Sequence, residues 1–433
     1  MSTNDNLDVI IVGAGLAGLA CAYETASAGL QVAVLEKGEV AGSKSLSGGR
    51  LYLEPVSELC REFLHDALFE RPVISESITI TDNNSSMSFR LDDNELQNRP
   101  NSVTVLLGRL NQRLAEKAAN KGAMVLPQQK VDNLLFEKET VVGVKIGSEE
   151  LRARVVVAAD GVLSFLAEEA GLRPQRPANS YGLGIKEIIE LKNSCIEDRF
   201  NLPPGKGASR LFFGMITHGL PGGGFIYTNS DSLSVGIVVN LGALSNWKSE
   251  TEVWELLEAF KSRPDIAPLL AGGKTVEYGA HLIPEGGFNA LPKPGLPGLL
   301  LVGDAAGFVL NTGYLLRGMD MALISGVLAA QSIIKTHQKN GDPAFCLTNY
   351  EQSLKESFIY KQIELYKKAP DLLTLDRMYK RYPQNIIQLT RELFHVDASG
   401  KNTSLWNACK KFMFKILGLK GLRDLWRFMR MDS

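Results

Sequence analysis

A glycine-rich turn between two apolar runs is the feature that most constrains how this 433-residue chain can fold. The run at 9–12 leads into GAGLAG at 13–18, and a helical stretch then leads into a second apolar run at 32–35. This order predicts a strand, a turn, a helix and a strand, which is how a dinucleotide-binding domain begins. The first glycine of such a turn allows the tight bend, the second lets the backbone approach a pyrophosphate, and the third lets the helix pack close to the strands.

Glu36 ends the second run, where a carboxylate can accept hydrogen bonds from both hydroxyls of an adenosine ribose. A carboxylate there disfavours a 2′-phosphate, so the pattern argues against NADP and leaves NAD and FAD open. The helix N-terminus would present free N–H groups and partial positive charge to the phosphates. The contacts expected in this segment are Gly13, Ala14, Gly15, Ala17, Gly18, Glu36 and Lys37.

The length of the chain favours two or more domains. A net charge of −1 gives no indication of a nucleic-acid partner. Five widely separated cysteines without a CxxC pair argue against a metal or iron–sulfur cluster built from this chain, and predict reduced thiols in a cytoplasmic protein. The five histidines show no metal-binding spacing, so no metal site is expected. We also expect no signal peptide and no transmembrane helix, because the apolar runs are short or interrupted.

Two further acid–glycine pairs follow apolar runs, Asp160-Gly161 and Gly303-Asp304. Ligands of parallel sheets bind at such strand ends. The small-residue loop at 42–50 has two interpretations, a backbone contact to a cofactor or a plain surface turn. A long helix is predicted from about Gly313 to Lys335. The candidate cofactor contacts beyond the first turn are Ser47, Gly48, Gly49, Arg50, Arg109, Val131, Asp160, Gly161, Gly303, Asp304, Gly313 and Tyr314.

The chain divides into three regions by pattern, which predicts the α/β class. A discontinuous Rossmann-like domain is expected at 1–75, 101–175 and 291–341. Residues 76–100 and 176–290 alternate apolar and polar residues with many glycines, which predicts an inserted, mostly antiparallel sheet. Residues 342–433 are expected to be helical.

The order of the three glycine–acid motifs is similar to that in a group of flavoproteins. This group contains aromatic hydroxylases, geranylgeranyl reductases and electron-transfer flavoprotein:quinone oxidoreductases. Within it, the chain resembles the FixC type over nearly its whole length. The segments that carry the resemblance are SGGR at 47–50, GGGFIYTN at 222–229 and GDAAGFVLNTGYLLRGMDMALISG at 303–326.

The resemblance implies one non-covalent FAD, an electron-transfer flavoprotein as donor and a quinone as acceptor. Asp304 would accept a hydrogen bond from a ribityl hydroxyl, whereas the carboxylate of Asp160 is expected to act structurally or indirectly. The helix near Gly313 would aim its positive end at the flavin N1–C2=O edge and stabilise reduced flavin. Full-length quinone oxidoreductases of the group carry a cysteine-ligated iron–sulfur domain, which is not seen in this sequence. FixC-type chains are expected to use a separate ferredoxin-like partner instead.

Two other hypotheses remain open at this stage. One is a self-sufficient enzyme that reduces or hydroxylates an apolar substrate with NAD(P)H, as a geranylgeranyl reductase would. The other is a flavin-binding subunit that serves assembly. Transfer between flavin and quinone depends mainly on distance and potential, so we nominate no catalytic acid or base.

The inserted sheet and the C-terminus are expected to provide the contacts with quinone and membrane. The glycines at 222–224 would let backbone lie near the flavin ring, and Phe225 and Tyr227 would line a quinone pocket. Residues 404–433 carry seven basic and two acidic residues, a net charge of +5, with apolar residues at helical spacing. This pattern predicts peripheral contact with the inner face of the cytoplasmic membrane, although packing on the FAD domain or binding the ferredoxin-like partner are alternatives.

Overall fold

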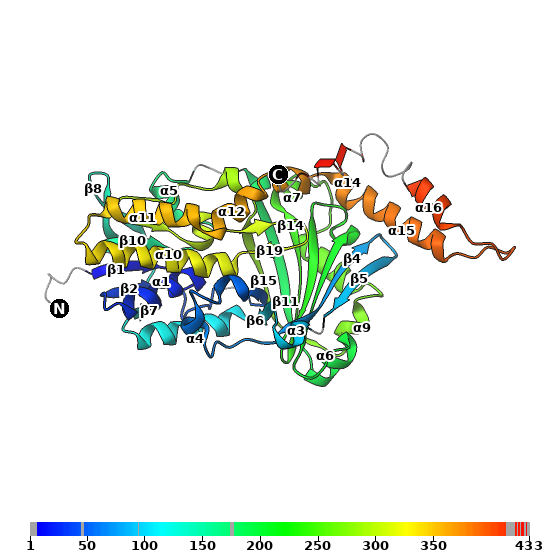
Figure 1. Ribbon diagram of the computed structural model, residues 1–433, viewed down its shortest axis with the longest axis horizontal. Helices are drawn as coiled ribbons and strands as arrows, with labels where there is room; N and C mark the ends of the chain where they lie inside the picture. Colours follow the sequence, from blue (N-terminus) through cyan, green and yellow to red (C-terminus); the bar gives the residue numbers. More distant parts are fainter. Residues whose placement is uncertain are drawn as a thin grey trace.

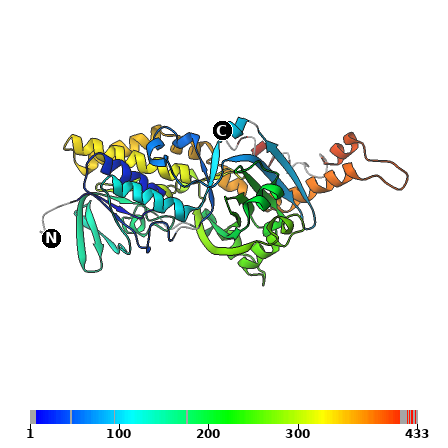
Figure 2. The same cartoon turned by 90° about the horizontal axis from the view of Figure 1, so that it is seen from below.

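The computed structural model describes residues 7–44, 47–93, 95–173 and 177–412, together with 421, 423–424, 426–427 and 430. Two sheets follow one another along the molecule, and a helical arm projects beyond the second sheet (Figures 1 and 2). The predicted α/β class is confirmed. Within the described part of the chain, no helix combines the length and apolar character needed to cross a bilayer.

The first sheet has a parallel centre, as expected for a dinucleotide-binding domain. β1 pairs in parallel with both β10 and β2, β10 with β17, and β2 with β7. Its strands in spatial order are β16 (Gly295–Leu296), β17 (Leu299–Leu301), β10 (Glu149–Ala158), β1 (Leu7–Val12), β2 (Val32–Leu35) and β7 (Met124–Leu126), and the antiparallel β8 (Asn133–Glu137) and β9 (Thr140–Ile146) extend β10. All four residues of β2 are buried, because β2 lies inside the parallel part of the sheet, which helices cover.

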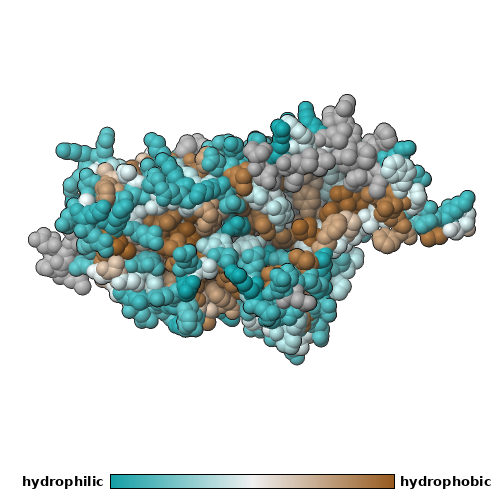
Figure 3. All heavy atoms as spheres, viewed as in Figure 1, coloured by the Kyte–Doolittle hydropathy of each residue, from teal (hydrophilic) through white to brown (hydrophobic). Residues whose placement is uncertain are grey.

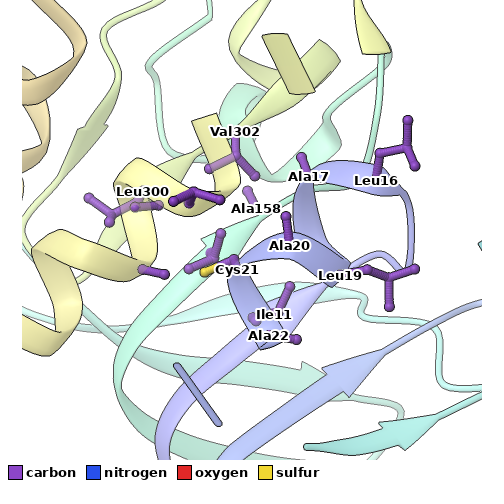
Figure 4. Close-up of a cluster of buried hydrophobic side chains, with 14 of the residues drawn as sticks. Ile11, Leu16, Ala17, Leu19, Ala20, Cys21, Ala22, Ala158, Leu300 and Val302 are labelled. Carbon is purple, nitrogen blue, oxygen red and sulfur yellow. The ribbon is translucent and has the colours of Figure 1, made fainter. Parts of the chain in front are cut away.

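Helix α1 (Leu16–Ser27) packs against α4 (Leu107–Asn120) and α10 (Met319–Gln338), and α10 packs against α11 (Pro343–Glu356). Glycines allow the close approach. A Cβ at Gly18 would lie 2.1 Å from the Gly13 carbonyl oxygen, and one at Gly326 would lie 2.1 Å from the Ala17 carbonyl oxygen. Figure 4 shows the small side chains of α1 meeting residues of β10 and of the segment after β17 in this core.

The second sheet is antiparallel except between β12 and β4. Its core is formed with the helices that cover one face, α6 (Asn193–Phe200) and α8 (Val253–Lys261). The strands in spatial order are β15 (Lys274–Pro284), β11 (Tyr181–Glu190), β14 (Ser232–Asn240), β13 (Gly222–Thr228), β12 (Gly207–Gly214), β4 (Val73–Thr81) and β5 (Ser86–Asp92). The mostly antiparallel sheet that the alternating pattern predicts is therefore present.

Shorter elements complete the two layers. β3 (Gly49–Tyr52) pairs with β6 (Ser102–Val105), and β18 (Leu310–Asn311) pairs with β19 (Leu316–Arg317). The short helices are α2 (Arg61–Leu64), α3 (Glu95–Asn98), α5 (Phe165–Glu169), α7 (Leu241–Ser245), α9 (Ala267–Leu270), and the 3₁₀ turns η1 (Glu54–Val56), η2 (Ala178–Ser180), η3 (Met215–Thr217), η4 (Phe288–Ala290) and η5 (Gly303–Ala306).

The C-terminal region is helical, as predicted, up to the last continuous described residue. α12 (Phe358–Leu365), α13 (Ala369–Leu373) and α14 (Asp376–Tyr379) lie on the body of the molecule, whereas α15 (Arg381–Phe394) and α16 (Leu405–Phe412) form the projecting arm (Figure 1). The two arm helices contact each other. Of the residues after 412, the structure describes only 421, 423–424, 426–427 and 430, so most of the C-terminal part of the predicted basic amphipathic stretch lies outside the described residues.

One predicted helix begins later than expected. The pattern from Gly313 onward suggested a continuous helix, but α10 begins at Met319. Gly313 has a positive φ of +90°, and the segment between β18 and β19 forms a tight hairpin before Gly318 caps the helix. Gly313 therefore makes a turn, and Gly318 is the N-cap residue of the helix.

Candidate active site

A cavity of about 820 Å³ lies between the two sheets. The first sheet contributes its glycine turn and its acid-ended strands, and the second sheet contributes β11, β13 and the end of β15. Leu373 and Tyr379 close one edge from α13 and α14. The predicted contact residues that line the cavity are Gly13, Gly15, Ala17, Glu36, Lys37, Gly48, Gly49, Arg50, Val131, Asp160, Gly161, Gly303, Asp304, Gly313 and Tyr314.

The three glycines of the first turn have different structural roles. Gly13 has φ +108°, and a Cβ there would lie 2.3 Å from the Ala159 carbonyl oxygen, so the bend requires glycine. Gly18 permits close helix packing and does not line the cavity. A Cβ at Gly15 would meet nothing within 4 Å, although Gly15 lines the cavity. Protein packing therefore does not require the glycine at 15, and a ligand that approaches its backbone would.

Glu36 is buried at the end of β2, where its carboxylate organises the turn. One oxygen accepts from the Ala14 N–H at 2.9 Å and the other from the Gly38 N–H at 2.7 Å. Ala14 is thus held by Glu36 and does not line the cavity. Carboxylate oxygens have spare lone pairs, so Glu36 keeps acceptor capacity toward the cavity while these bonds fix its orientation.

Asp304 and Asp160 both line the cavity, and their carboxylates differ in partners. Asp160 accepts from the Ser164 hydroxyl at 2.8 Å and from the Leu166 N–H at 3.3 Å, so it supports the first turn of α5, whose N-cap residue is Ser164. Asp304 accepts no side-chain hydrogen bond from any described residue, and burial raises its pKa to about 6, against a lowering effect of Arg173. Asp304 is half-buried, and a carboxylate withdrawn from water without a hydrogen-bond donor is costly unless a ligand satisfies it.

The loop before β3 reaches the cavity with Gly48 and Gly49, but the Arg50 guanidinium serves a structural network. It forms an ion pair with Glu76 and donates to the Ser102 hydroxyl at 2.8 Å, so it ties β3 to β4 and β6. Gly48 has φ +80°, and its carbonyl accepts from Lys186 Nζ. The backbone contact that we predicted for this loop is thus geometrically available.

Two predicted contacts besides Ala14 and Gly18 also do not line the cavity, Arg109 and Ser47. The Arg109 side chain is 60% exposed, and its guanidinium lies 3.8 Å from a Glu70 carboxylate oxygen. The Ser47 N–H donates to Glu277 at 2.9 Å, which anchors the loop to β15. The residues of α4 that line the cavity are Leu107 and Asn111, whereas Arg109 lies on the exposed face of the helix between them.

The N-terminus of α10 reaches the cavity through Gly318 and Met319. In its first turn, Asp320 is buried and forms an ion pair with Arg317. The positive end of the helix dipole is therefore still directed at the cavity, although the helix begins six residues after the predicted Gly313.

Sequence reasoning did not identify two titratable residues of the second sheet. Burial lowers the pKa of Lys186 to about 7, with Glu277 opposing the shift. Burial raises the pKa of Glu285 to about 7, with a hydrogen bond from Asn311 opposing it. No sequence motif includes Lys186. Glu285 follows a strand and precedes two glycines, and this pattern could have indicated a strand-end residue at the cavity. No group of histidine, cysteine or acidic side chains in the described ranges is arranged to hold a metal.

These features fit a flavin dinucleotide. The pyrophosphate would use the open space at Gly15. The adenosine ribose would use Glu36 at the end of β2, and the ribityl chain would use Asp304, whose carboxylate has no hydrogen-bond donor among the described residues. The cavity then continues past the dinucleotide turn to the second sheet, where Phe225 and Tyr227 stack with ring centroids 4.9 Å apart.

Two family models match the chain. The FAD binding domain model matches residues 6–195, and the model described as ETF-QO, ubiquinone-binding, matches residues 181–283. The second match covers β11 to most of β15, which form the far wall of the cavity.

Curated relatives are similar over almost the full length. Protein FixC of Salmonella typhi is 40% identical over 430 residues, which covers 98% of this chain and 100% of that protein. YdiS of Escherichia coli (strain K12), named a probable electron transfer flavoprotein-quinone oxidoreductase, is 39% identical over 397 residues and covers 91% of this chain and 92% of that protein.

A solved structure of a geranylgeranyl bacteriochlorophyll reductase-like protein from Thermoplasma acidophilum has the same fold. It aligns with a TM-score of 0.72 at 21% identity, covering 97% of this chain and 99% of that one. The relatives and both family models agree with the geometry of the cavity. The chain is an FAD-binding oxidoreductase and belongs to the FixC family of electron transfer flavoprotein-quinone oxidoreductase-like flavoproteins.

Proposed function

We propose that this protein takes electrons from an electron-transfer flavoprotein onto FAD and passes them to a quinone. The observation that carries the proposal is one continuous cavity with two unlike walls. The glycine turn and two acid-ended strands form the first wall, and the segment that matches the ubiquinone-binding model forms the second. The names of relatives such as YdiS support the same reaction.

In this proposal the first wall holds FAD, which supplies a carrier that accepts two electrons and releases them singly or in pairs. Gly15 gives the pyrophosphate access to the backbone, Glu36 accepts from the adenosine ribose, and Asp304 accepts from the ribityl chain. The remaining contacts would come from the loop at 48–50 and from residues of the other strand ends. These residues are Gly13, Ala17, Lys37, Val131, Gly161, Gly303, Gly313 and Tyr314.

The second wall is proposed to bind the quinone ring. Phe225 and Tyr227 present a stacked aromatic pair on β13, and Ile78 and Leu211 add apolar surface from the neighbouring strands. Such a wall favours a flat apolar ring and keeps water away from it. Lys186 holds the Gly48 carbonyl and so fixes the loop between the two walls.

Two protein partners belong to the same proposal. The electron-transfer flavoprotein would be the donor, and a separate ferredoxin-like iron–sulfur protein would extend the electron route. The second partner is proposed because the five cysteines of the sequence stand far apart and include no CxxC pair. A bound cluster in the purified complex, and none in the chain alone, is the expected result.

The arm is proposed to contact the inner face of the cytoplasmic membrane, where quinones are dissolved. Large apolar side chains are exposed near the outer ends of its two helices, with Phe394 84% and Trp406 73% exposed and Val396 and Leu405 beside them. Hydrophobic residues gather along the arm in Figure 3. Exposed apolar side chains near the outer end of the arm, tryptophan among them, are suited to the lipid interface, and Lys410 on α16 adds attraction to anionic lipid.

Liposome flotation tests the membrane contact. The double variant Phe394→Ser, Trp406→Ser should float with anionic vesicles several-fold less than the unaltered protein. Trp254→Ser is the matched control, because Trp254 is 53% exposed on α8, away from the arm. Equal flotation of all three proteins would rule out the arm as the contact.

A donor experiment tests the function itself. FAD in the purified protein should be reduced by reduced electron-transfer flavoprotein and reoxidised by a water-soluble quinone analogue. NADH and NADPH should reduce it far more slowly. Rapid reduction by NADPH alone would instead support a reductase or hydroxylase, and reduction by no donor together with no quinone turnover would support an assembly role.

A further inference from the structure

A carboxyl group of the second sheet stands in the cavity without an assigned role. Glu285 directly follows β15 and lines the cavity. Its Oε1 accepts a hydrogen bond from Asn311 Nδ2 at 3.0 Å, across from β15 to β18. Its own N–H donates to the Ser180 carbonyl at 2.8 Å. The backbone and the side chain of Glu285 are therefore both held.

The neighbouring strand leaves room for this carboxyl group. Gly182 of β11 lies beside it, and a Cβ at position 182 would come within 2.8 Å of the Glu285 carboxyl carbon. Any other residue at 182 would push the carboxyl group from its place. The position of Glu285 thus depends on a glycine in β11 and on an amide from the β18–β19 hairpin.

The surroundings of Glu285 contain no cation that pairs with it among the described residues. Asn311 is neutral, and from α14 the Tyr379 hydroxyl donates to the Leu373 carbonyl at 2.7 Å, with its pKa raised by burial and by Glu285. Two other titratable side chains of the adjacent strands line the same cavity, His281 on β15 and Lys186 on β11, and burial lowers the pKa of both. Burial, partly offset by Asn311, places the pKa of Glu285 at about 7, so a large fraction of this group carries a proton at neutral pH.

We propose that Glu285 is a proton donor to the quinone, a role that rests on the proposed function. Reduction of a quinone to a quinol consumes two electrons and two protons. The Glu285 O–H bond breaks, its proton joins one quinone oxygen and Glu285 becomes a carboxylate. The two electrons and the second proton come from the reduced flavin, and water then returns a proton to Glu285. Atoms and charge balance in this sequence.

The distinguishing variant is Glu285→Gln, which keeps an oxygen that can accept from Asn311 but has no acidic proton. At pH 6 we expect reoxidation of reduced FAD by a water-soluble quinone analogue to slow by about 10²-fold, the lower range for removal of a general acid. The unaltered protein should lose rate as pH rises through about 7. The variant should show a flat profile, and Glu285→Asp should restore part of the rate.

Reduction of FAD by dithionite, which needs no quinone, is the control and should not change in either variant. Thermal unfolding of the apoprotein gives a readout independent of activity. The folded-state pKa of Glu285 is raised, so the native protein loses stability as pH rises from the unfolded-state value of about 4.5 to about 7. Glu285→Gln should remove this loss, so the variant should gain in melting temperature relative to the unaltered protein between pH 5 and pH 8.

The outcomes separate this inference from the function. If Glu285→Gln reoxidises with quinone as fast as the unaltered protein and keeps its pH profile, Glu285 is not the donor, although the function stands. If the unaltered protein reduces no quinone analogue, the function fails and the inference fails with it.

Discussion

The two walls of the cavity are built on different principles. The first wall uses backbone: Gly13 bends the chain, Gly15 leaves space and Glu36 orients the turn through two N–H groups. The second wall uses side chains that meet across strands, such as the stacked Phe225 and Tyr227 and the Glu285–Asn311 pair. Backbone geometry requires particular residues at fixed local spacing, whereas contacts between side chains of distant strands produce no local sequence pattern. The first wall is therefore the one that can be recognised by motif.

The largest effect is expected at Gly15. Gly15→Val places a side chain in open cavity space, so the protein should fold but lose FAD almost completely. Gly15→Ala should give an intermediate loss because its side chain is smaller. Flavin absorbance after desalting, with circular dichroism to check folding, measures both. A folded Gly15→Val protein with full FAD would remove the first wall from the cofactor site.

The next effect is expected at Asp304. Asp304→Ala should weaken FAD binding by about 1.5–3 kcal/mol, the usual value for a hydrogen bond to a charged group. Ionised Asp304 is the better acceptor, so affinity in the unaltered protein should rise as pH increases through about 6. Asp304→Asn should abolish that rise. An FAD dissociation constant that does not change in Asp304→Ala, measured by fluorescence titration, would move the role elsewhere.

The smallest effect on FAD is expected at Asp160, although it lies on the same wall. Its carboxylate already accepts from Ser164 and Leu166, so Asp160→Ala should cost about 1 kcal/mol of folding stability through loss of these hydrogen bonds at the start of α5. Its FAD affinity should stay within about threefold, well below the Asp304 effect. Urea unfolding and FAD titration of the same preparation measure the two quantities. A loss of affinity as large as that of Asp304→Ala would show that both acids serve the ligand.

Local sequence predicted the parts of this molecule that depend on local geometry. The glycine turn, the acid-ended strands and the alternating second sheet all follow from spacing. The start of α10 was misplaced because Gly313 and Gly318 look alike in sequence, and only the β18–β19 hairpin distinguishes the turn from the cap. The position of Lys186 at the cavity could not be predicted from local sequence, because its hydrogen-bond partner Gly48 lies 138 residues away. Arg109 was predicted as a cofactor contact, but its side chain is 60% exposed and does not line the cavity.

The central claim is that one cavity joins a flavin wall to a quinone wall, and photo-labelling tests it most directly. A photoreactive quinone analogue should label the FAD-loaded protein on residues that line the cavity within 181–285, with Phe225 and Tyr227 among the labelled positions. Excess unlabelled quinone should prevent the labelling, and Phe225→Ala should reduce it. Competed labelling that maps only outside 181–285 would contradict the account.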